Sequence, residues 1–359
     1  MKKRLMAVLV CLVGVLLIAG AASAKTTIRF WAEWAEHEVL PIIEGFEAAN
    51  PDYTVEYTQF KWGEMMPRLL TAQAAGTPPD VLIQDRFRVG GWAARNGAMA
   101  LDALIEADPE ISPEQFYPAT WYEANWQGKQ YAIPWQTDVR AVYWNKDIFA
   151  EVGLDPNLEP DTSNWETMAD LAVKLTEIDS AGNVVRIGFI PSQGSWGNGG
   201  DYVYVWANGG DFMSEDGRTV TLTDPKIVET LEWMSDIANR CGGIEKLAAF
   251  GATFLEGAQK PFLTGQIAMQ VTGDWEYRDI LKYNPSMNFG IGSWKIRGTD
   301  TPITFSGGFA LAIPAGVKDT DGAWKLIKYM AGLEGQVKLI ESTGTIPALR
   351  AAANDEAIT

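Results

Sequence analysis

Three side chains with complementary chemistry lie within six positions of one another in the first half of the chain. Trp135 offers a flat apolar ring, Asp138 a carboxylate and Arg140 a guanidinium. We expect an extended segment here, because Pro134 disfavours the helical region for its predecessor and polar and apolar residues alternate over 138–143. Such a strand either presents a ring and two charges to a ligand or is an ordinary buried strand with paired charges.

The N-terminal part of the chain alternates between strand and helix patterns. The strand patterns are Thr27–Trp31, Tyr53–Tyr57 and a buried run that ends at Ile83. The helix patterns between them have apolar residues at helical spacing, over Val39–Phe46 and Trp62–Ala75. This alternation predicts an α/β fold with a mostly parallel sheet covered by helices.

Ligands of open α/β sheets bind beyond the carboxyl ends of the strands. That rule selects Trp31, Trp34 and Glu36 after the first strand, and Asp85 and Arg86 after the third. An alternative interpretation of the last two is a helix N-cap followed by a surface charge.

A glycine-rich loop occurs over 191–200 and contains Trp196. The loop lacks the dinucleotide-binding glycine spacing and has no Lys-Ser/Thr pair, so its sequence does not favour phosphate binding. We interpret it as a flexible loop that presents the Trp196 ring.

The N-terminus has the pattern of an export signal. Lys2, Lys3 and Arg4 precede an apolar run from Leu5 to Ile18, and Ala22-Ser-Ala24 is a small-residue cleavage motif. A transmembrane anchor is the alternative, but the run is short for a membrane span. We therefore expect 1–24 to be a signal peptide, cleaved after Ala24.

Charge and cysteine content exclude several classes of function. The formal net charge is −17, and removal of three cations with the signal makes it −20, which disfavours nucleic acid and anionic membranes as partners. Cys241 is the single cysteine of the mature chain, so no intramolecular disulfide forms there. With His37 as the only histidine, a multi-histidine metal site is excluded. We expect no metal and no cofactor.

Several segments resemble family 1 extracellular solute-binding proteins, the maltose-binding type of sugar receptors for ABC importers. Gly128–Pro134 followed by Val142–Phe149 is similar to the segment that leaves the first lobe of these proteins and enters the second. Ala74–Val81, Gly265–Trp275 and Gly307–Pro314 are similar to other family segments. The resemblance implies a two-lobe periplasmic-binding-protein fold of type II, in which each lobe is a mixed sheet flanked by helices and the ligand cleft lies between the lobes.

The resemblance also implies domain boundaries. We expect the first lobe over 25–134, the second over 135–304, a return to the first over 305–348, and the start of a third crossing over 349–359. The family usually continues for several tens of residues and adds helices to the second lobe. We therefore expect either a truncated sequence or a reduced second lobe.

Site residues follow from the resemblance position by position. The run Asp85-Arg-Phe87 resembles a segment that presents charged side chains to sugar hydroxyls, and Trp275 stands where the family delivers an aromatic residue into the cleft. A core tryptophan is the alternative for Trp275. Gly307 and Gly308 begin the return strand. Arg350 stands where the family often has a basic residue near the cleft, and a surface role is equally consistent with its position.

The chain is rich in the residues that bind sugars. A sugar ring has an apolar face suited to aromatic rings and a rim of hydroxyls suited to carboxylates and guanidinium groups. The chain has 15 tryptophans, several of them at expected strand ends. They are Trp31, Trp34, Trp135, Trp196 and Trp275. We predict a monomeric receptor that binds a sugar or oligosaccharide and delivers it to a membrane permease.

Two other classes of function stay open. A receptor for a polyamine or another cation also uses aromatic rings and acids. A glycoside hydrolase shares the same residue types, but its catalysis needs a spaced pair of carboxylates that nothing in the sequence marks. No Gly-x-Ser-x-Gly motif supports serine hydrolysis. We therefore expect a binding protein and not an enzyme.

Overall fold

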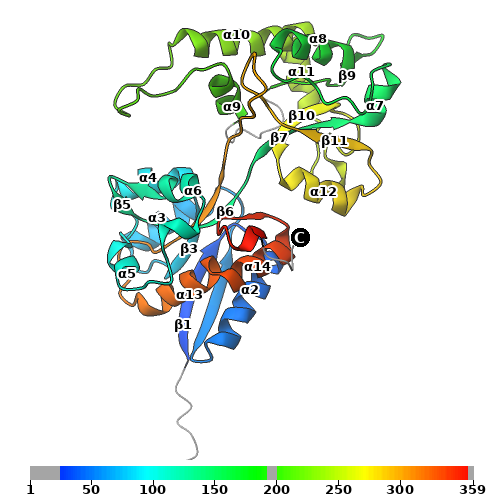
Figure 1. The fold of residues 1–359 in the computed structure, drawn as a ribbon. Helices are drawn as coiled ribbons and strands as arrows, with labels where there is room; N and C mark the ends of the chain where they lie inside the picture. The colour runs from blue at the N-terminus through cyan, green and yellow to red at the C-terminus, as the bar shows by residue number, and fades with distance from the viewer. Residues whose placement is uncertain (1–24, 192–199, 355–359) are drawn as a thin grey trace, which may run out of the picture.

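The computed structural model describes residues 25–191 and 200–354, which form two lobes joined by two crossing segments (Figure 1). The first lobe is built on a mixed sheet with the strand order β13-β6-β12-β3-β1-β2. Strand β1 pairs in parallel with β2 and β3, whereas β12 is antiparallel to both of its neighbours. The strands are β1 (Thr26–Ala32), β2 (Tyr53–Gln59), β3 (Val81–Asp85), β6 (Ile133–Thr137), β12 (Gly308–Ala312) and β13 (Ile346–Pro347).

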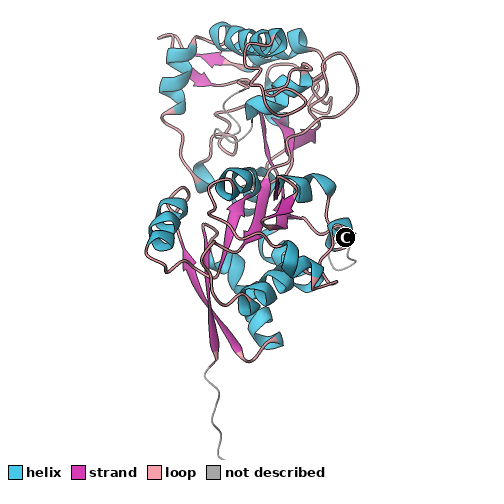
Figure 2. Ribbon diagram, turned by 90° about the vertical axis from the view of Figure 1, so that its left-hand side faces the viewer, coloured by secondary structure: helices cyan, strands magenta, loops and turns pink. Residues whose placement is uncertain are grey.

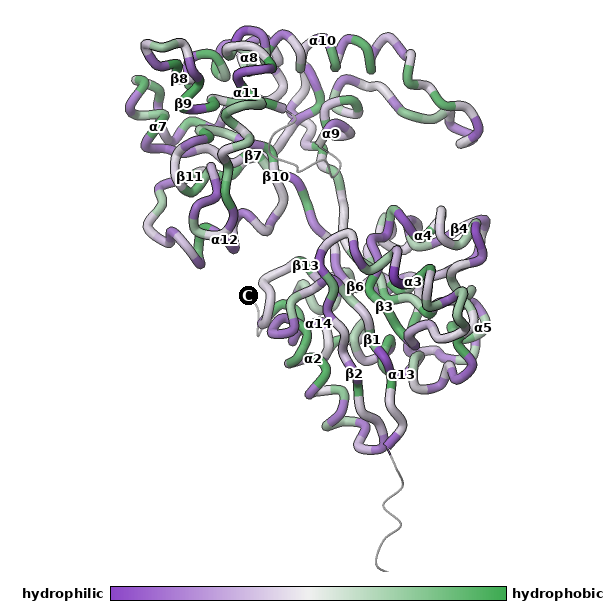
Figure 3. Tube along the Cα trace, turned by 180° about the vertical axis from the view of Figure 1, so that it is seen from behind, coloured by the Kyte–Doolittle hydropathy of each residue, from purple (hydrophilic) through white to green (hydrophobic). Residues whose placement is uncertain are grey.

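Helices cover both faces of this sheet (Figure 2). They are α2 (Glu36–Ala49), α3 (Met65–Ala74), α4 (Arg86–Ala93), α5 (Asp102–Glu106), η1 (Pro113–Gln115), α6 (Pro118–Glu123), α13 (Asp321–Ala331), α14 (Leu333–Thr343) and η3 (Ala352–Asn354). On β3, Val81 and Ile83 belong to one buried cluster and Leu82 belongs to another. Successive side chains point to opposite faces of a strand, so these two clusters are the cores on the two faces. The apolar character of β3 is visible in Figure 3.

The second lobe contains a smaller sheet with the order β10-β7-β11, whose strands are antiparallel. An isolated parallel β-bridge pairs Ile187 with Ile267. The large core of the second lobe includes Trp294, Tyr204 and Phe189. The strands are β7 (Arg140–Asn145), β10 (Met269–Gly273) and β11 (Phe289–Gly292), with a hairpin of β8 (Glu177–Ile178) and β9 (Val184–Arg186). The helices are α7 (Lys146–Glu151), α8 (Trp165–Leu175), α9 (Gly200–Ala207), α10 (Pro225–Arg240), α11 (Ile244–Gly251), η2 (Gly257–Gln259) and α12 (Trp275–Tyr283).

The two crossing segments run side by side (Figure 1). One connects β6 to β7 through residues 138–139, and the other leads from residue 304 into β12. The Thr304 hydroxyl accepts a hydrogen bond from the Arg140 amide at 2.8 Å and donates one to the Arg140 carbonyl at 2.9 Å. These bonds tie the two segments together, so we expect them to bend as a pair.

The first crossing begins later than the sequence predicts. Strand β6 runs to Thr137 within the first-lobe sheet, so the boundary expected after residue 134 falls inside this strand. Pro134 does not end the pairing, because β12 and β13 continue to pair with β6 beyond it. A second short hairpin, β4 (Asn125–Trp126) and β5 (Lys129–Gln130), precedes β6.

Among the described residues, no helix is both long and apolar enough to cross a membrane.

Candidate functional site

An aromatic and acidic surface forms at the first-lobe end of the crossing segments. Strand pairing places Phe309 of β12 directly beside Asp85, the last residue of β3. The Trp62 ring lies 5.7 Å from the Phe309 ring, and the Trp62 residue is 62% exposed. The ring of Trp34 also approaches Phe309, edge-on at 5.4 Å. An exposed ring beside a carboxylate is therefore available to a ligand on this lobe.

Trp62 and Phe309 are not among the site residues predicted from the sequence. The apolar pattern predicted Trp62 inside a helix, but α3 begins only at Met65, and Trp62 lies in the loop beyond the carboxyl end of β2. The strand-end rule that selected Trp34 and Asp85 would have selected Trp62 had the loop been recognised. Phe309 has no comparable signal in the sequence, because only the register of β12 brings it to Asp85.

Asp85 is partly buried and ion-paired with Arg88 across 3.2 Å. Burial raises the pKa of its carboxyl from 3.8 to about 6. Arg88 lowers this pKa, whereas the negative charges of Glu33 and Asp138 raise it. The carboxyl is therefore mostly ionised at neutral pH and becomes protonated in mildly acidic solution.

Arg86, expected at the ligand, instead connects backbone segments inside the first lobe. Its side chain is only 1% exposed, and its Nε donates to Glu123 at 2.9 Å. The two terminal nitrogens donate to the carbonyl oxygens of Gln136 and Gly307. Arg86 therefore joins the start of α4 to β6 and to the second crossing segment, and we assign it a structural role.

The second-lobe side of the site is built around Arg140. Its guanidinium pairs with Asp138 and lies 4.6 Å from the centre of the Trp275 ring and 5.1 Å from that of Phe305. Both charged side chains are almost fully buried. The strand expected to deliver Trp275 ends at Gly273, and Trp275 is the first residue of α12. The ring is partly exposed, so the core interpretation of Trp275 does not describe this structure.

Asp274 lies beside Trp275 and also has an altered acidity. Burial raises its pKa from 3.8 to about 6, Asp138 raises it further and Arg278 lowers it. The negative charge of Asp138, in the first crossing segment, thus raises the pKa of Asp85 in the first lobe and of Asp274 in the second. Arg278 in turn donates a hydrogen bond of 2.7 Å to the carbonyl of Thr343, which belongs to the first lobe.

Gly307 and Gly308 shape the second crossing segment. The Gly307 amide donates to the Asp138 carboxylate at 2.9 Å, and a Cβ on Gly307 would lie 2.8 Å from that carboxylate. Gly308 has a φ of +125°, and a Cβ there would collide with the Gln136 carbonyl. Both glycines are buried, so they allow the close approach of the two segments.

The remaining expected site residues of the first lobe have other surroundings. Trp135 is 0% exposed in the first-lobe core, where its ring contacts Trp34 at 5.0 Å, so we assign it to packing. Trp31 is partly buried against Phe60, with their rings 4.9 Å apart. Glu36 is exposed at the first turn of α2. Trp196 lies outside the described residues.

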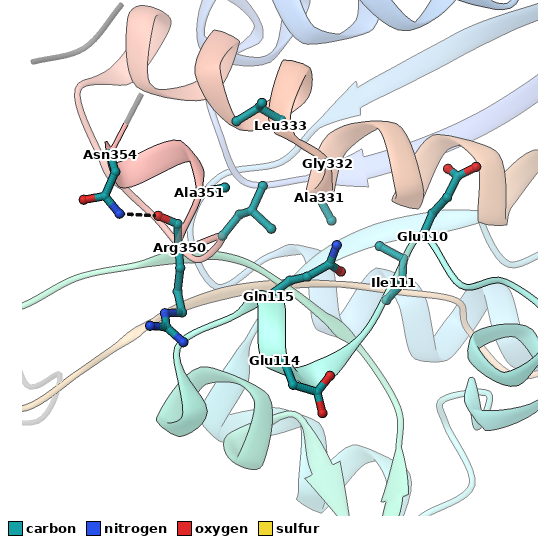
Figure 4. Close-up of a pocket in the computed structure, with 11 residues that line it drawn as sticks. Glu110, Ile111, Glu114, Gln115, Ala331, Gly332, Leu333, Arg350, Ala351 and Asn354 are labelled. Atoms are coloured by element: carbon teal, nitrogen blue, oxygen red, sulfur yellow. Dashed lines mark hydrogen bonds between the residues drawn. The ribbon is translucent and has the colours of Figure 1, made fainter. Parts of the chain in front are cut away.

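Arg350 lies at a pocket of the first lobe with a volume of about 460 Å³ (Figure 4). The pocket is bordered by the loop at Glu110–Gln115, the turn between α13 and α14, and residues Leu349–Asn354. Asn354 donates a hydrogen bond of 3.0 Å to the Arg350 carbonyl. None of the residues around Asp138 borders this pocket. The structure therefore separates Arg350 from the other candidate site residues.

Similar proteins share this architecture. A structure described as CpMnBP1 with mannobiose bound has a TM-score of 0.80 at 24% identity, covering 92% of this chain and 86% of that one. Maltose-bound MalE3 of T. maritima has a TM-score of 0.73 at 22% identity, covering 93% and 84%. At these identities the likeness concerns the fold, which is that of two-lobe binding proteins.

Sequence comparison gives the same assignment. The sn-glycerol-3-phosphate-binding periplasmic protein of Escherichia coli strain K12 is 25% identical over 357 residues, covering 94% of this chain and 77% of the relative. A putative binding protein of Brucella abortus strain 2308 is 22% identical over 333 residues, covering 92% and 77%. The family described as bacterial extracellular solute-binding protein matches residues 42–359. The chain therefore belongs to the family of bacterial extracellular solute-binding proteins.

Proposed function

We propose that this protein captures an uncharged sugar between its lobes by hinge closure and delivers it to an ABC-type import permease. The observation that carries the proposal is the pair of aromatic and acidic surfaces on either side of the crossing segments. Trp62 and Asp85 form one, and Trp275 with its neighbour Asp274 forms the other, where the buried Asp138–Arg140 pair supports the Trp275 ring. Trp62 and Trp275 suit the apolar ring faces, and the carboxylates suit the hydroxyls.

An anionic ligand such as glycerol 3-phosphate, which the Escherichia coli relative binds by its name, fits this site less well. The arginines around the site already have anionic or carbonyl partners, because Arg88 pairs with Asp85 and Arg140 with Asp138. Arg278 donates to the Thr343 carbonyl. A phosphate would have to compete for these groups beside Asp85, Asp138 and Asp274, and like charges repel.

A cationic ligand such as a polyamine is the second candidate. The observation in its favour is that Asp85 and Asp274 are acidic groups beside the aromatic rings, and aromatic rings with acids also bind amines. Hydrogen bonding to sugar hydroxyls and ion pairing to amines differ in their response to salt. Binding of a neutral sugar should change little between low and high ionic strength, whereas binding of a polyamine should weaken.

A thermal-shift screen tests the proposal. The protein would be heated with mannose, glucose, mannobiose, maltose and their trisaccharides, alongside spermidine, glycerol 3-phosphate and amino acids. A ligand at 100 times its Kd stabilises the folded state by about 2.7 kcal/mol, which raises the melting temperature measurably. We expect a saccharide to give the largest shift. A shift confined to spermidine or to glycerol 3-phosphate would replace the sugar assignment.

The proposal includes export and processing. The basic start, the apolar run and the Ala22-Ser-Ala24 motif support cleavage after Ala24. The intact mass of the protein purified from its native host should therefore correspond to a chain that begins at Lys25. Retention of residues 1–24 would contradict an extracytoplasmic receptor.

We also propose that the protein acts as a monomer and leaves its ligand chemically unchanged. Membership of a family of binding proteins supports this, and the sequence marks no catalytic pair of carboxylates. Mass spectrometry after prolonged incubation with a bound oligosaccharide should recover the intact sugar. Cleavage that stops on substitution of a single carboxylate would indicate a glycoside hydrolase instead.

A further inference from the structure

The helix that presents Trp275 to the proposed site also buries a carboxyl in the second lobe. Trp275 is the first residue of α12 and is partly exposed, whereas Glu276, the next residue, is only 4% exposed. The Oε1 atom of Glu276 is buried and has no hydrogen-bond partner within the described residues. The proposed sugar site does not use this carboxyl.

Neutral polar side chains of the second-lobe sheet surround Glu276. Gln270 of β10 lies next to it and is also buried, and the side-chain nitrogen of Gln270 has no partner in the described part of the chain. Tyr143 of β7 is buried as well, and burial followed by the charges of Asp274 and Glu276 raises the pKa of its phenol. A carboxyl in this setting is stable when it is neutral and costly when it is ionised.

The charged groups near Glu276 do not supply it with a counter-ion of its own. Burial raises the pKa of the Glu276 carboxyl from 4.5 to about 7, Lys260 and the Gln270 amide lower it, and Asp279 and Glu256 raise it further. Lys260 is already ion-paired with Asp279. A helix N-terminus favours a negative charge, but this effect is smaller than the cost of desolvating a buried carboxylate. The Glu276 carboxyl is therefore mostly protonated below pH 7 and mostly ionised above it.

Ionisation of Glu276 acts on the helix that carries Trp275. A buried carboxylate without its own counter-ion favours positions of α12 in which the carboxylate reaches water. Because Trp275 and Glu276 are consecutive residues of one helix, such a shift also moves the Trp275 ring. In the shifted helix the carboxyl has its ordinary pKa of 4.5, so the buried position loses population as the pH rises from about 4.5 to about 7 and then stays constant.

We propose that Glu276 is a positioning residue, which holds the Trp275 ring in place for the ligand only while its own buried carboxyl is protonated. This inference rests on the proposed function and adds a proton dependence to it. Glu276 acts in the direction opposite to Asp85, whose carboxyl must lose its proton to accept strong hydrogen bonds from hydroxyls. The receptor therefore binds its ligand best over a limited pH range and loses affinity on both sides of it.

Calorimetric titration of the parent protein and of Glu276→Gln between pH 5.5 and pH 8.5 tests the inference. The titrant is the saccharide that stabilises the parent most in the thermal-shift screen. Glutamine has the size of glutamate and stays neutral, so it keeps α12 in its buried position at every pH. The measured quantity is the Kd of the parent divided by that of the variant, in which the contributions of Asp85 and Asp274 cancel. We expect this ratio to rise by about threefold or more up to pH 8 and then to level off, and a single proton limits the rise to about tenfold per pH unit.

Two further variants separate the buried carboxyl from general effects of charge and folding. Glu245→Gln removes an exposed carboxylate in the first turn of α11, in the same lobe, so its Kd relative to the parent should stay constant across this pH range. Thermal unfolding shows whether each variant is folded. If Glu276→Gln is unfolded, Glu276→Met, which is also neutral and of similar length, takes its place.

The melting temperature gives a second measurement, which needs no ligand. The pKa of Glu276 is higher in the folded protein than its ordinary value, so the stability that the protonated carboxyl contributes is complete below about pH 4.5 and is lost as the pH rises through about 7. The melting temperature of the parent should therefore fall relative to that of Glu276→Gln over this range, and the two should run parallel at higher pH.

The outcomes distinguish this inference from the proposed function. If the Kd ratio of parent to Glu276→Gln is constant with pH, the role of Glu276 is wrong and the sugar receptor stands. Melting temperatures that run parallel over the whole pH range would also overturn the inference, because the carboxyl would then titrate as it does in the unfolded chain. If the parent binds no saccharide at any pH, the proposed function fails and this inference fails with it.

Discussion

The two sides of the proposed site are held in place by different means. On the first lobe, Asp85 and Phe309 are neighbours in a sheet, so backbone hydrogen bonds fix their separation. On the second lobe, Trp275 begins a helix and is positioned by the guanidinium of Arg140, which directly follows the crossing segment. The first side is therefore preformed, whereas the position of the second depends on the crossing segments. A substitution in the crossing segments should therefore shift the position of Trp275 more than that of Asp85.

The largest effect is expected from Arg86→Met, which tests how α4 is held to β6 and to the second crossing segment. The substitution leaves the Glu123 carboxylate and the carbonyls of Gln136 and Gly307 without their buried partner. Removing one member of a buried charged network costs about 3–5 kcal/mol. Urea unfolding should show this loss in the free energy of unfolding.

Arg88→Met is the matched control for that experiment. Arg88 lies two residues after Arg86 on the same helix, but its side chain is 43% exposed and its ion pair is with Asp85. Exposed ion pairs contribute about 0–1 kcal/mol. Equal losses of stability for the two variants would contradict the structural role assigned to Arg86.

The next effect is expected from Trp275→Ala, which removes the ring of the second side. A buried aromatic anchor contributes about 2–4 kcal/mol to binding at an interface hot spot. Calorimetry with the saccharide that binds best should therefore show a large increase in Kd while the protein stays folded. Trp126→Ala is a control, because this partly exposed tryptophan lies on the β4–β5 hairpin. Parental affinity for Trp275→Ala would remove Trp275 from the site.

The contrast between the two sides also explains what could be predicted from the sequence. Alternating strand and helix patterns predicted the first-lobe sheet, and the strand-end rule selected Asp85, whose role at the ligand stays a prediction. Which side chains face outward depends on pairing between distant strands, which no local pattern contains. Trp135 and Arg86 were thus expected at the ligand but are buried, whereas Phe309 reached Asp85 only through the register of β12. The crossing at residues 138–139 likewise depends on how far β12 and β13 pair with β6.

Asp85→Asn tests the hydrogen-bonding group of the preformed side. Asparagine keeps the shape but loses the charge, and hydrogen bonds to charged groups contribute about 1.5–3 kcal/mol. We expect a loss of affinity in this range by calorimetry at pH 7.5. Glu44→Gln changes an exposed carboxylate in the middle of α2 on the same lobe, and it should not alter binding.

The pH dependence of binding is an independent test of Asp85 as a ligand-binding group. Because burial raises the pKa of Asp85 to about 6, the carboxyl gains a proton as the pH falls below that value. The protonated group is a weaker acceptor, so Kd should rise by about tenfold at one pH unit below the pKa. Asp85→Asn should reduce this dependence, and what remains reports Asp274, whose pKa is also about 6. An unchanged pH profile in Asp85→Asn would contradict the role of Asp85.

The smallest expected effect is the coupling between the two sides. Asp85 and Trp275 belong to different lobes, so a ligand contacts both only when the lobes close around it. Once either contact is lost, the closed state is populated less and the other contact contributes less to binding. The loss of binding free energy in the double variant, Asp85→Asn with Trp275→Ala, should therefore be smaller than the sum of the losses in the two single variants by about 0.5 kcal/mol or more. The pair Asp85→Asn and Trp62→Ala, both on the preformed first lobe, isolates direct local coupling from coupling through closure. If the calorimetric cycle for Asp85 and Trp275 is additive, the two residues bind the ligand independently, and the crossing segments do not link them.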